Sequence, residues 1–352
     1  MPLLARMVAA PLSIDVRSGA VADLGELLAD RRISMGGQVA VAVGPGQGER
    51  VAELMAPKLG NADVFPVSGG TLDAALDLGR HLREKSYDAI VGIGGGKTLD
   101  VSKYAAATYG IPMVSVATSL AHDGIASPVS VLDHDGGRGS YGVHIPIAVV
   151  VDLDFVREGQ GRQTRSGIGD AISNISAVAD WHLASRCRDE RVDGLAATFA
   201  RTAAEAVLHH PEGVESDAFL TVLAEALVFS GLSMAVAGSS RPCSGACHEI
   251  SHALDSLFSS PGTHGEQVGL GAAFASFLRE DEQGAAQLGA CLTRHGLPRT
   301  PADLGLRDEQ FARAVAHAPH TRPDRYTILE HLGLSDEAVR DRVAAYVQTV
   351  GS

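Results

Sequence analysis

The sequence has few cysteines, no long apolar run and no excess of positive charge. Its four cysteines, Cys187, Cys243, Cys247 and Cys291, are scattered over 352 residues. This spacing excludes a disulfide-rich scaffold and predicts a reducing, cytoplasmic compartment. Cys243 and Cys247 are four residues apart, but no second cysteine pair completes a zinc ribbon with them.

The formal net charge is −13, and no basic stripe is visible. Because phosphate backbones are held by clustered lysine and arginine, a nucleic-acid partner is excluded. No stretch of eighteen apolar residues occurs, and the N-terminal MPLLARMVAAPLS is interrupted by Arg6, so we expect neither a membrane span nor a secretory signal. With 45% hydrophobic residues, a chain of this length is expected to build two domains.

The chain is organised around residues 91–127, which begin VGIGGGKTLDVSK. The apolar run YDAIVGI breaks at Gly94, Gly95 and Gly96 and passes directly into a helical segment near Lys97. Glycines let the backbone turn sharply, and the free N–H groups of the following helix point at whatever lies in front of them. This turn therefore predicts an anion-binding site.

A second apolar run, PMVSVAT, is followed by a polar turn with Thr118, Ser119, His122 and Asp123. In a parallel sheet, turns that follow neighbouring strands lie at the same carboxyl edge, where ligands bind. We therefore expect the polar turn and the glycine turn to form one cofactor and substrate site.

The order of patterns predicts an α/β N-terminal domain with a parallel sheet over residues 1–155 and an all-α domain over residues 156–352. Strands and helices alternate up to the polar turn, with strands at LSIDV, QVAVAV and ADVFPV and a helix at AVADLGELLADRR. A β-hairpin is expected from SPVSVLD and HIPIAVVVD. The predicted helices of the second domain span residues 166–185, 192–209, 217–238, 244–258, 265–279, 284–295, 308–316 and 335–349.

The helical half contains three candidate metal ligands, Asp170, His248 and His264. One carboxylate and two imidazoles suit zinc with a fourth position open to water or substrate. Each residue also has a plainer interpretation. Asp170 is well placed to cap a helix, His248 and His252 share one helix face and can simply pack, and His264 can be an ordinary loop residue.

Five ordered blocks within about residues 38–275 resemble the sn-glycerol-1-phosphate dehydrogenase family: GGGKTLDVSK, SVATSLAHDGIASP, GIGDAISNISAVADWHLA, AGSSRPCSGACHEISHALD and THGEQVGLG. That family belongs with the glycerol dehydrogenases, iron-containing alcohol dehydrogenases and dehydroquinate synthase. The resemblance implies a dehydroquinate synthase-like fold, with a dinucleotide-binding domain followed by a helical metal-binding domain.

The resemblance also implies roles for individual residues. Asp170, His248 and His264 match the metal ligands, Asp123 matches a position between nicotinamide and substrate, and His252 lies near the substrate in relatives. The positions that match the cofactor site are Gly94, Gly95, Gly96, Lys97, Asp100, Thr118, Ser119 and Ser127.

Two departures from the family pattern bear on the metal. Iron-dependent relatives have a histidine four residues after the aspartate, where this chain has Asn174, and this difference favours zinc over iron or nickel. Where relatives commonly read SGSEH, this chain reads SGACH, so Cys247 replaces an acidic residue beside the ligand.

The resemblance predicts NAD or NADP as hydride carrier and interconversion of dihydroxyacetone phosphate and sn-glycerol 1-phosphate, or of a related phosphorylated or phosphonate carbonyl compound. Lys97, Lys103 and Arg241 are the candidates for a substrate phosphate, although Lys103 can equally pair with Asp100 on its own helix. Alternatives are a sugar-phosphate cyclase of the dehydroquinate synthase type, a non-phosphorylated polyol dehydrogenase, and a non-catalytic cofactor-binding regulator. We expect a homo-oligomer, as in relatives, and an active-site cleft between the domains.

Overall fold

The computed structural model describes residues 8–59, 62–159, 161–259 and 261–351. The chain forms two compact units, one ending at Gly161 and the other beginning at Arg162. The sequence places this boundary after residue 155, within the short helix α5 (Leu153–Glu158). In the structure α5 packs on the strand that precedes it, β8 (Ala148–Asp152), and so belongs to the first unit.

The first unit is built on a six-stranded sheet with the order β1-β8-β5-β4-β2-β3, in which every neighbouring pair is parallel. The strands other than β8 are β1 (Ser13–Arg17), β2 (Val39–Val43), β3 (Asp63–Pro66), β4 (Ala89–Gly94) and β5 (Met113–Ala117). All residues of the central strands β2, β4, β5 and β8 are buried, as expected of a parallel sheet covered on both faces. The predicted parallel sheet is confirmed.

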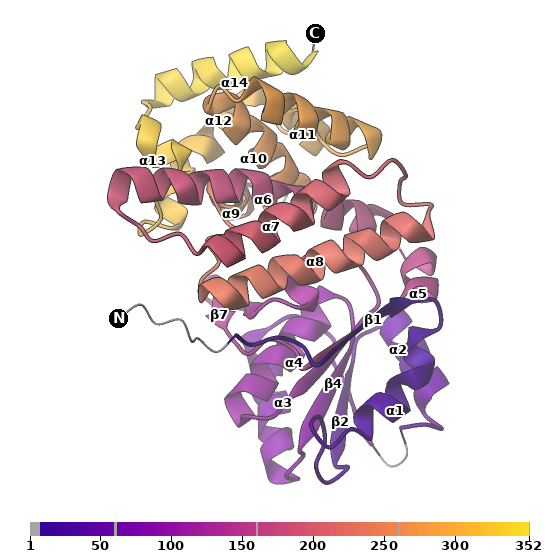
Figure 1. The fold of residues 1–352 in the computed structure, drawn as a ribbon. Helices are drawn as coiled ribbons and strands as arrows, with labels where there is room; N and C mark the ends of the chain where they lie inside the picture. Colours follow the sequence, from indigo (N-terminus) through magenta and orange to yellow (C-terminus); the bar gives the residue numbers. More distant parts are fainter. Residues whose placement is uncertain (1–7, 60–61, 160, 260, 352) are drawn as a thin grey trace, which may run out of the picture. The chain divides into compact units, whose positions relative to one another are not determined.

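Helices cover both faces of this sheet (Figure 1). Helices α3 (Leu72–Glu84) and α4 (Gly96–Tyr109) pack together on one side, while α1 (Leu24–Leu28) and α2 (Gln47–Met55) lie on the other. The helix expected over residues 20–32 is shorter and divided, because a 3-10 turn, η1 (Ala20–Asp23), precedes α1. A second 3-10 turn, η2 (Asp123–Ile125), follows β5.

The predicted hairpin is wrong in its second strand. The hairpin joins β6 (Val129–His134) to β7 (Gly137–Gly142), the glycine-rich segment expected to be its loop. The run AVVVD, expected as the returning strand, is instead β8 and lies between β1 and β5 in the main sheet. A fully apolar strand buries both of its faces, which the sheet centre provides and a two-stranded hairpin does not.

The described residues of the second unit form helices joined by loops, and the predicted helices are confirmed with small shifts of their ends. They are α6 (Gly161–Arg188), α7 (Gly194–Leu208), α8 (Asp217–Ala237), α9 (Ala246–Phe258), α10 (His264–Leu278), α11 (Glu282–Arg294), α12 (Asp308–His317) and α14 (Asp336–Gly351). Three short elements were not predicted from the sequence: η3 (Pro301–Leu304), η4 (Ala318–Thr321) and α13 (Ile328–Leu332).

One described helix, α8, is long and apolar enough by length and composition to cross a membrane. Within the structure 61% of its most apolar window is buried, which is typical of the core helix of a folded unit. The N-terminal stretch considered for a secretory signal includes residues 1–7, which lie outside the described residues.

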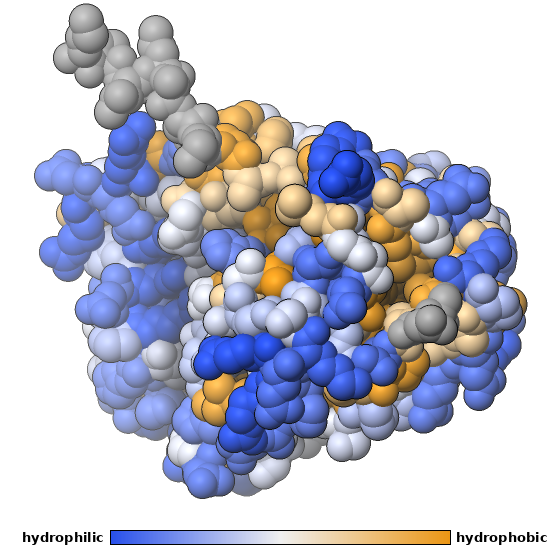
Figure 2. All heavy atoms as spheres, turned by 90° about the horizontal axis from the view of Figure 1, so that it is seen from below, coloured by the Kyte–Doolittle hydropathy of each residue, from blue (hydrophilic) through white to orange (hydrophobic). Residues whose placement is uncertain are grey.

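The surface view in Figure 2 shows hydrophilic residues interspersed with hydrophobic areas. Exposed large hydrophobic side chains occur on several separate elements, for example Ile14 on β1, Leu76 on α3 and Phe229 on α8. Single exposed apolar residues of this kind are normal in folded proteins. Among the described residues, these exposed hydrophobic side chains therefore mark no single binding face.

Candidate active site

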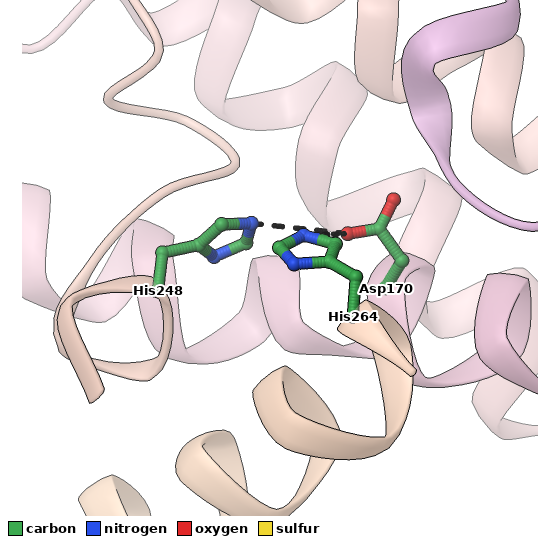
Figure 3. A group of neighbouring side chains, drawn as sticks. All are labelled: Asp170, His248 and His264. Atoms are coloured by element: carbon green, nitrogen blue, oxygen red, sulfur yellow. Dashed lines mark ion pairs between the residues drawn. The ribbon is translucent and has the colours of Figure 1, made fainter. Parts of the chain in front are cut away.

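The three predicted metal ligands come together in the second unit (Figure 3). Asp170 lies in the first half of α6, His248 in the first turn of α9, and His264 is the first residue of α10. One potential ligand atom from each side chain lies within 4.8 Å of the other two. In Figure 3 the three side chains point toward one another.

Glycines next to two of these ligands bring their helices into backbone contact. A β-carbon on Gly265 would overlap the carbonyl oxygen of Ser166, and one on Gly169 would overlap the carbonyl oxygen of Gly265. The Gly265 N–H also donates to the Ser166 Oγ at 3.0 Å. Only glycine permits so close an approach, which fixes the position of Asp170 relative to His264.

The spacing of the cluster fits a divalent metal. Asp170 Oδ1 lies 3.8 Å from His248 Nε2 and 3.6 Å from His264 Nε2. A tetrahedral zinc ion with bonds of about 2.0–2.1 Å separates neighbouring ligand atoms by roughly 3.3 Å, so small side-chain shifts suffice. The Asp170 and His248 side chains are 5% and 12% exposed, but that of His264 is 37% exposed, which leaves one side of the cluster open.

Burial favours the neutral, metal-binding form of His248. Its pKa is lowered well below the usual value, first by loss of solvation and then by the charge of His264. Asp170 opposes this shift, and His252 and Arg322 add smaller contributions that lower the pKa further. A neutral imidazole presents the lone pair that a metal requires. His248 is thus in a suitable protonation state for metal binding at neutral pH.

Neighbouring polar groups orient the two imidazoles. The Cys247 sulfur lies 3.4 Å from His248 Nδ1, and burial raises the pKa of that thiol to about 12, so it is protonated at neutral pH. The Ser251 Oγ lies 3.4 Å from His264 Nδ1 and donates to Gln267 at 2.5 Å. Contacts to the second ring nitrogen fix the orientation of a metal-binding histidine.

Asn174, which occupies the position of a fourth ligand in iron-dependent relatives, is engaged elsewhere. It is 1% exposed, and its Nδ2 donates to the Ser230 Oγ at 2.8 Å and to the Ala200 carbonyl at 3.4 Å. The amide therefore joins α6 to α7 and α8. The protein offers three ligands to a metal at this cluster.

In the first unit, the predicted glycine turn forms the N-terminus of α4. Gly95 is the N-cap residue and supplies no side-chain cap, and the first turn has no acidic residue. A β-carbon on Gly96 would overlap the His122 ring, whereas one on Gly95 would meet only the Ser119 Oγ at 3.5 Å. The helix N–H groups are thus left for an anion, with His122 and Ser119 beside them.

The other predicted cofactor positions differ in their surroundings. Lys97 is exposed in the first turn of α4, and the Thr118 N–H donates to the Gly94 carbonyl at 3.1 Å. Ser127 is buried beside Lys103, whose Nζ contacts the Ser127 carbonyl at 3.3 Å. Ser127 and Lys103 therefore lie in the interior of the first unit.

Asp100 and Lys103 form a buried ion pair. The Lys103 side chain is fully buried, and its Nζ lies 2.9 Å from Asp100 Oδ1, although the angle does not suit a hydrogen bond. Lys103 also donates to the Val129 carbonyl. The predicted pairing of Lys103 with Asp100 is confirmed. The Lys103 ammonium group is therefore held by contacts inside the first unit.

The two predicted catalytic residues lie in different units. Asp123, the last residue of the polar turn, begins η2, and its carbonyl accepts from the N–H groups of Ala126 and Ser127. His252 is one helical turn after His248 on α9, and its Nε2 lies 3.3 Å from Arg322 Nη2. Sequence reasoning did not identify Arg322, because it is 70 residues from His252 and lies in no motif.

Comparison with known proteins places this fold in a class. A family model described as iron-containing alcohol dehydrogenase matches residues 15–159. Among solved structures, a probable glycerol dehydrogenase from Sinorhizobium meliloti 1021 has a TM-score of 0.77 at 22% identity, covering 98% of this chain and 99% of that one. Sulfoacetaldehyde reductase from Bifidobacterium kashiwanohense, in complex with NAD+, has a TM-score of 0.71 at 18% identity, covering 98% and 100%. The fold is that of the iron-containing alcohol dehydrogenases.

Curated relatives identify the family within this class. The glycerol-1-phosphate dehydrogenase (NAD(P)+) of Methanosarcina acetivorans is 32% identical over 98% of this chain and 97% of its own. The enzyme of the same name from Hyperthermus butylicus is 35% identical over 97% and 98%. A third, from Archaeoglobus fulgidus, is 41% identical over 69% and 71%. This chain belongs to the glycerol-1-phosphate dehydrogenase family.

Proposed function

We propose that this chain is a metal-dependent NAD(P)-linked dehydrogenase that interconverts dihydroxyacetone phosphate and sn-glycerol 1-phosphate. The observation that carries the proposal is the cluster of Asp170, His248 and His264, present in a chain that matches relatives named for this reaction over nearly their whole length. The relatives' names do not favour the cyclase or the non-phosphorylated polyol dehydrogenase.

In the second unit, Asp170, His248 and His264 would hold the metal. We propose zinc, because three ligands with one open side suit zinc and Asn174 is bonded to other helices. When bound, the metal supplies Lewis-acid polarisation of a carbonyl and the reduced nicotinamide supplies hydride. The protein's part is to fix the ligand set and keep His248 neutral.

In the first unit, the N-terminus of α4 would hold the dinucleotide pyrophosphate. Gly94, Gly95 and Gly96 let the phosphates approach the backbone, and the unpaired N–H groups of the first helical turn donate to them. Ser119 and Thr118 lie beside that turn. NAD and NADP are both retained as the hydride carrier. The cytoplasmic compartment and the assembly into a homo-oligomer stay predictions.

Reduction of a ketone requires a proton as well as a hydride. We assign its transfer to Asp123 in the polar turn, with His252 as the alternative. Comparing Asp123→Asn with His252→Gln separates the two. The variant that removes the proton donor lowers kcat while leaving metal content and dinucleotide affinity unchanged.

The test is oxidation of NADH or NADPH by zinc-loaded protein in the presence of dihydroxyacetone phosphate. We expect the absorbance of reduced nicotinamide to fall in proportion to the substrate consumed and sn-glycerol 1-phosphate to form. Full activity after metal removal would overturn the metal-dependent mechanism. In a parallel assay with a sugar phosphate as substrate, product formation without net nicotinamide oxidation would instead identify a cyclase.

A further inference from the structure

Three arginine side chains of the second unit surround one cavity. Arg241, Arg322 and Arg325 line a cavity of about 400 Å³ together with Glu190 and the loop residues between the last two arginines. Arg241 precedes α9, and the other two follow η4. The cavity therefore brings together cationic groups that are about eighty residues apart in the sequence.

The three arginines differ in how their charge is balanced. Arg241 is paired with Glu190, with Nε to Oε1 at 2.6 Å, and also donates to the Tyr326 carbonyl. Within the described residues, neither Arg322 nor Arg325 forms an ion pair with a carboxylate. The one other carboxylate that lines the cavity, on Asp324, is exposed. Among the described residues, no carboxylate is paired with the guanidinium group of Arg322 or Arg325.

Both of these arginines contact a single hydroxyl group. Arg322 Nη1 donates to the Ser240 Oγ at 3.2 Å, and Arg325 Nη2 donates to the same oxygen at 3.0 Å. A hydroxyl that accepts two hydrogen bonds still has its own hydrogen to donate. Ser240 thus holds the guanidinium groups side by side and can add a donor of its own.

Partial burial makes this arrangement costly without an anion. Burial lowers the pKa of Arg322, and burial together with the charges of Arg322 and Arg241 lowers that of Arg325 to about 10. Partly desolvated like charges destabilise one another unless an opposite charge joins them. A dianionic phosphate carries the charge that would compensate the pair, and guanidinium groups match its oxygens in forked geometry.

The arginine pair lies close to the metal cluster along α9. Arg322 Nη2 is 3.3 Å from His252 Nε2, and His252 follows the ligand His248 by one helical turn. A turn of helix rises about 5.4 Å. In a three-carbon keto phosphate, only a few bonds separate the carbonyl from the phosphate. We therefore expect one substrate molecule to reach both the metal cluster and the arginine pair.

We propose that Arg322 and Arg325, oriented by Ser240, bind the phosphate of the substrate and select phosphorylated ketones over their non-phosphorylated analogues. This inference rests on the proposed function and adds the residues that set its specificity. Arg322 and Arg325 take the place of two earlier candidates for the phosphate site. Lys103 is held in a buried ion pair, and Arg241 is paired with Glu190.

The decisive variant is Arg322→Gln, measured in the metal-loaded enzyme with dihydroxyacetone phosphate and with dihydroxyacetone. We expect kcat/KM for the phosphorylated substrate to fall on the order of 100-fold, as loss of a charged hydrogen-bond donor predicts, and kcat/KM for dihydroxyacetone to change little. Arg322→Lys keeps the charge and should recover part of the loss. Arg342→Gln, an exposed arginine on α14, is the matched control.

Binding of inorganic phosphate gives a readout independent of turnover. Calorimetric titration of the metal-loaded wild type should show phosphate binding that Arg322→Gln loses and Arg342→Gln retains, with equal metal content in all three proteins. Retained phosphate binding in Arg322→Gln, or an equal loss of kcat/KM with both substrates, would overturn the inference. Failure of the wild type to reduce dihydroxyacetone phosphate, with phosphate binding still dependent on Arg322, would overturn the proposed function and leave the anion site standing.

Discussion

The glycine turn of the first unit and the metal cluster of the second present different chemistry to their ligands. The turn offers backbone N–H groups at the start of α4, and its side chains are mostly absent because the residues are glycines. The cluster offers one carboxylate and two imidazoles from three helices. Substitutions therefore act in opposite ways at the two sites. A larger side chain in the glycine turn should weaken anion binding, whereas a smaller side chain in the metal cluster should weaken metal binding.

The cations of the two units differ as well. Lys103 of the first unit is fully buried and paired with Asp100, whereas Arg322 and Arg325 of the second unit are partly exposed and form no ion pair within the described residues. A buried, paired cation maintains a fold, and an unpaired one is available to a ligand. This contrast separates a structural lysine from candidate binding arginines.

The largest effect is expected from His264→Ala in the metal cluster. Loss of one of three ligands should abolish tight metal binding and lower kcat/KM on the order of 1000-fold, since metal polarisation contributes several kcal/mol. Metal analysis and nicotinamide oxidation measure the two effects, and dinucleotide affinity should not change. His182→Ala, an exposed histidine on the same helix as Asp170, is the control. Full metal content in His264→Ala would remove His264 from the ligand set.

Lys103→Met should lower the free energy of unfolding by about 3 kcal/mol, because it leaves the Asp100 carboxylate buried without its partner. Urea unfolding measures the change, and adding Asp100→Asn should restore part of it. Lys85→Met, which breaks an exposed pair with Asp63, is the comparison and should have little effect. Equal losses from both substitutions would refute the structural role of Lys103.

Gly96→Ala should weaken binding of NADH or NADPH on the order of tenfold, because the added β-carbon overlaps the His122 ring beside the helix N-terminus. Fluorescence titration of the reduced nicotinamide measures the dissociation constant, and metal content should stay unchanged. Gly194→Ala, where a β-carbon meets nothing within 4 Å, controls for the glycine replacement itself. Unaltered dinucleotide affinity in Gly96→Ala would place the pyrophosphate elsewhere.

The smallest effect is expected from the buried Glu249 on α9. Burial, and then the charge of Glu330, raise its pKa to about 9, so the folded chain holds a proton that the unfolded chain releases near pH 4.5. This group's contribution to stability is therefore complete below pH 4.5 and declines as the pH rises toward 9. The neutral Glu249→Gln should flatten that decline and raise the Tm at pH 8 by roughly 2 °C or more.

Thermal unfolding at several pH values tests this expectation, with the exposed Glu225→Gln as control. A steeper loss of stability with pH in Glu249→Gln would contradict a protonated Glu249 in the folded chain.

Sequence patterns predicted the elements whose signal is local. The glycine turn before α4 and the apolar runs of β2, β4 and β5 follow from neighbouring residues alone. The residue types of Asp170, His248 and His264 nominated a metal site that the fold then brought together. Local patterns failed where the partner is distant, because a run such as AVVVD does not specify whether β6 or β5 lies beside it.

The arginine cavity escaped prediction for the same physical reason. Arg322 and Arg325 become notable only through contacts with Ser240 and His252, which lie at least 70 residues earlier in the chain. No periodicity or spacing within the sequence records such a contact. A cavity of this kind depends on tertiary contacts between distant segments and can be recognised only in the folded structure.

The backbone contact between Gly265 on α10 and Ser166 on α6 bears on how the enzyme can be handled. Because main-chain packing holds Asp170 and His264 near each other, we expect the separation of these two ligands not to depend on a bound metal. A chelator should then strip the metal and leave the helices folded. Different divalent ions could be loaded into the same protein in turn, which makes metal identity an experimental variable that needs no refolding.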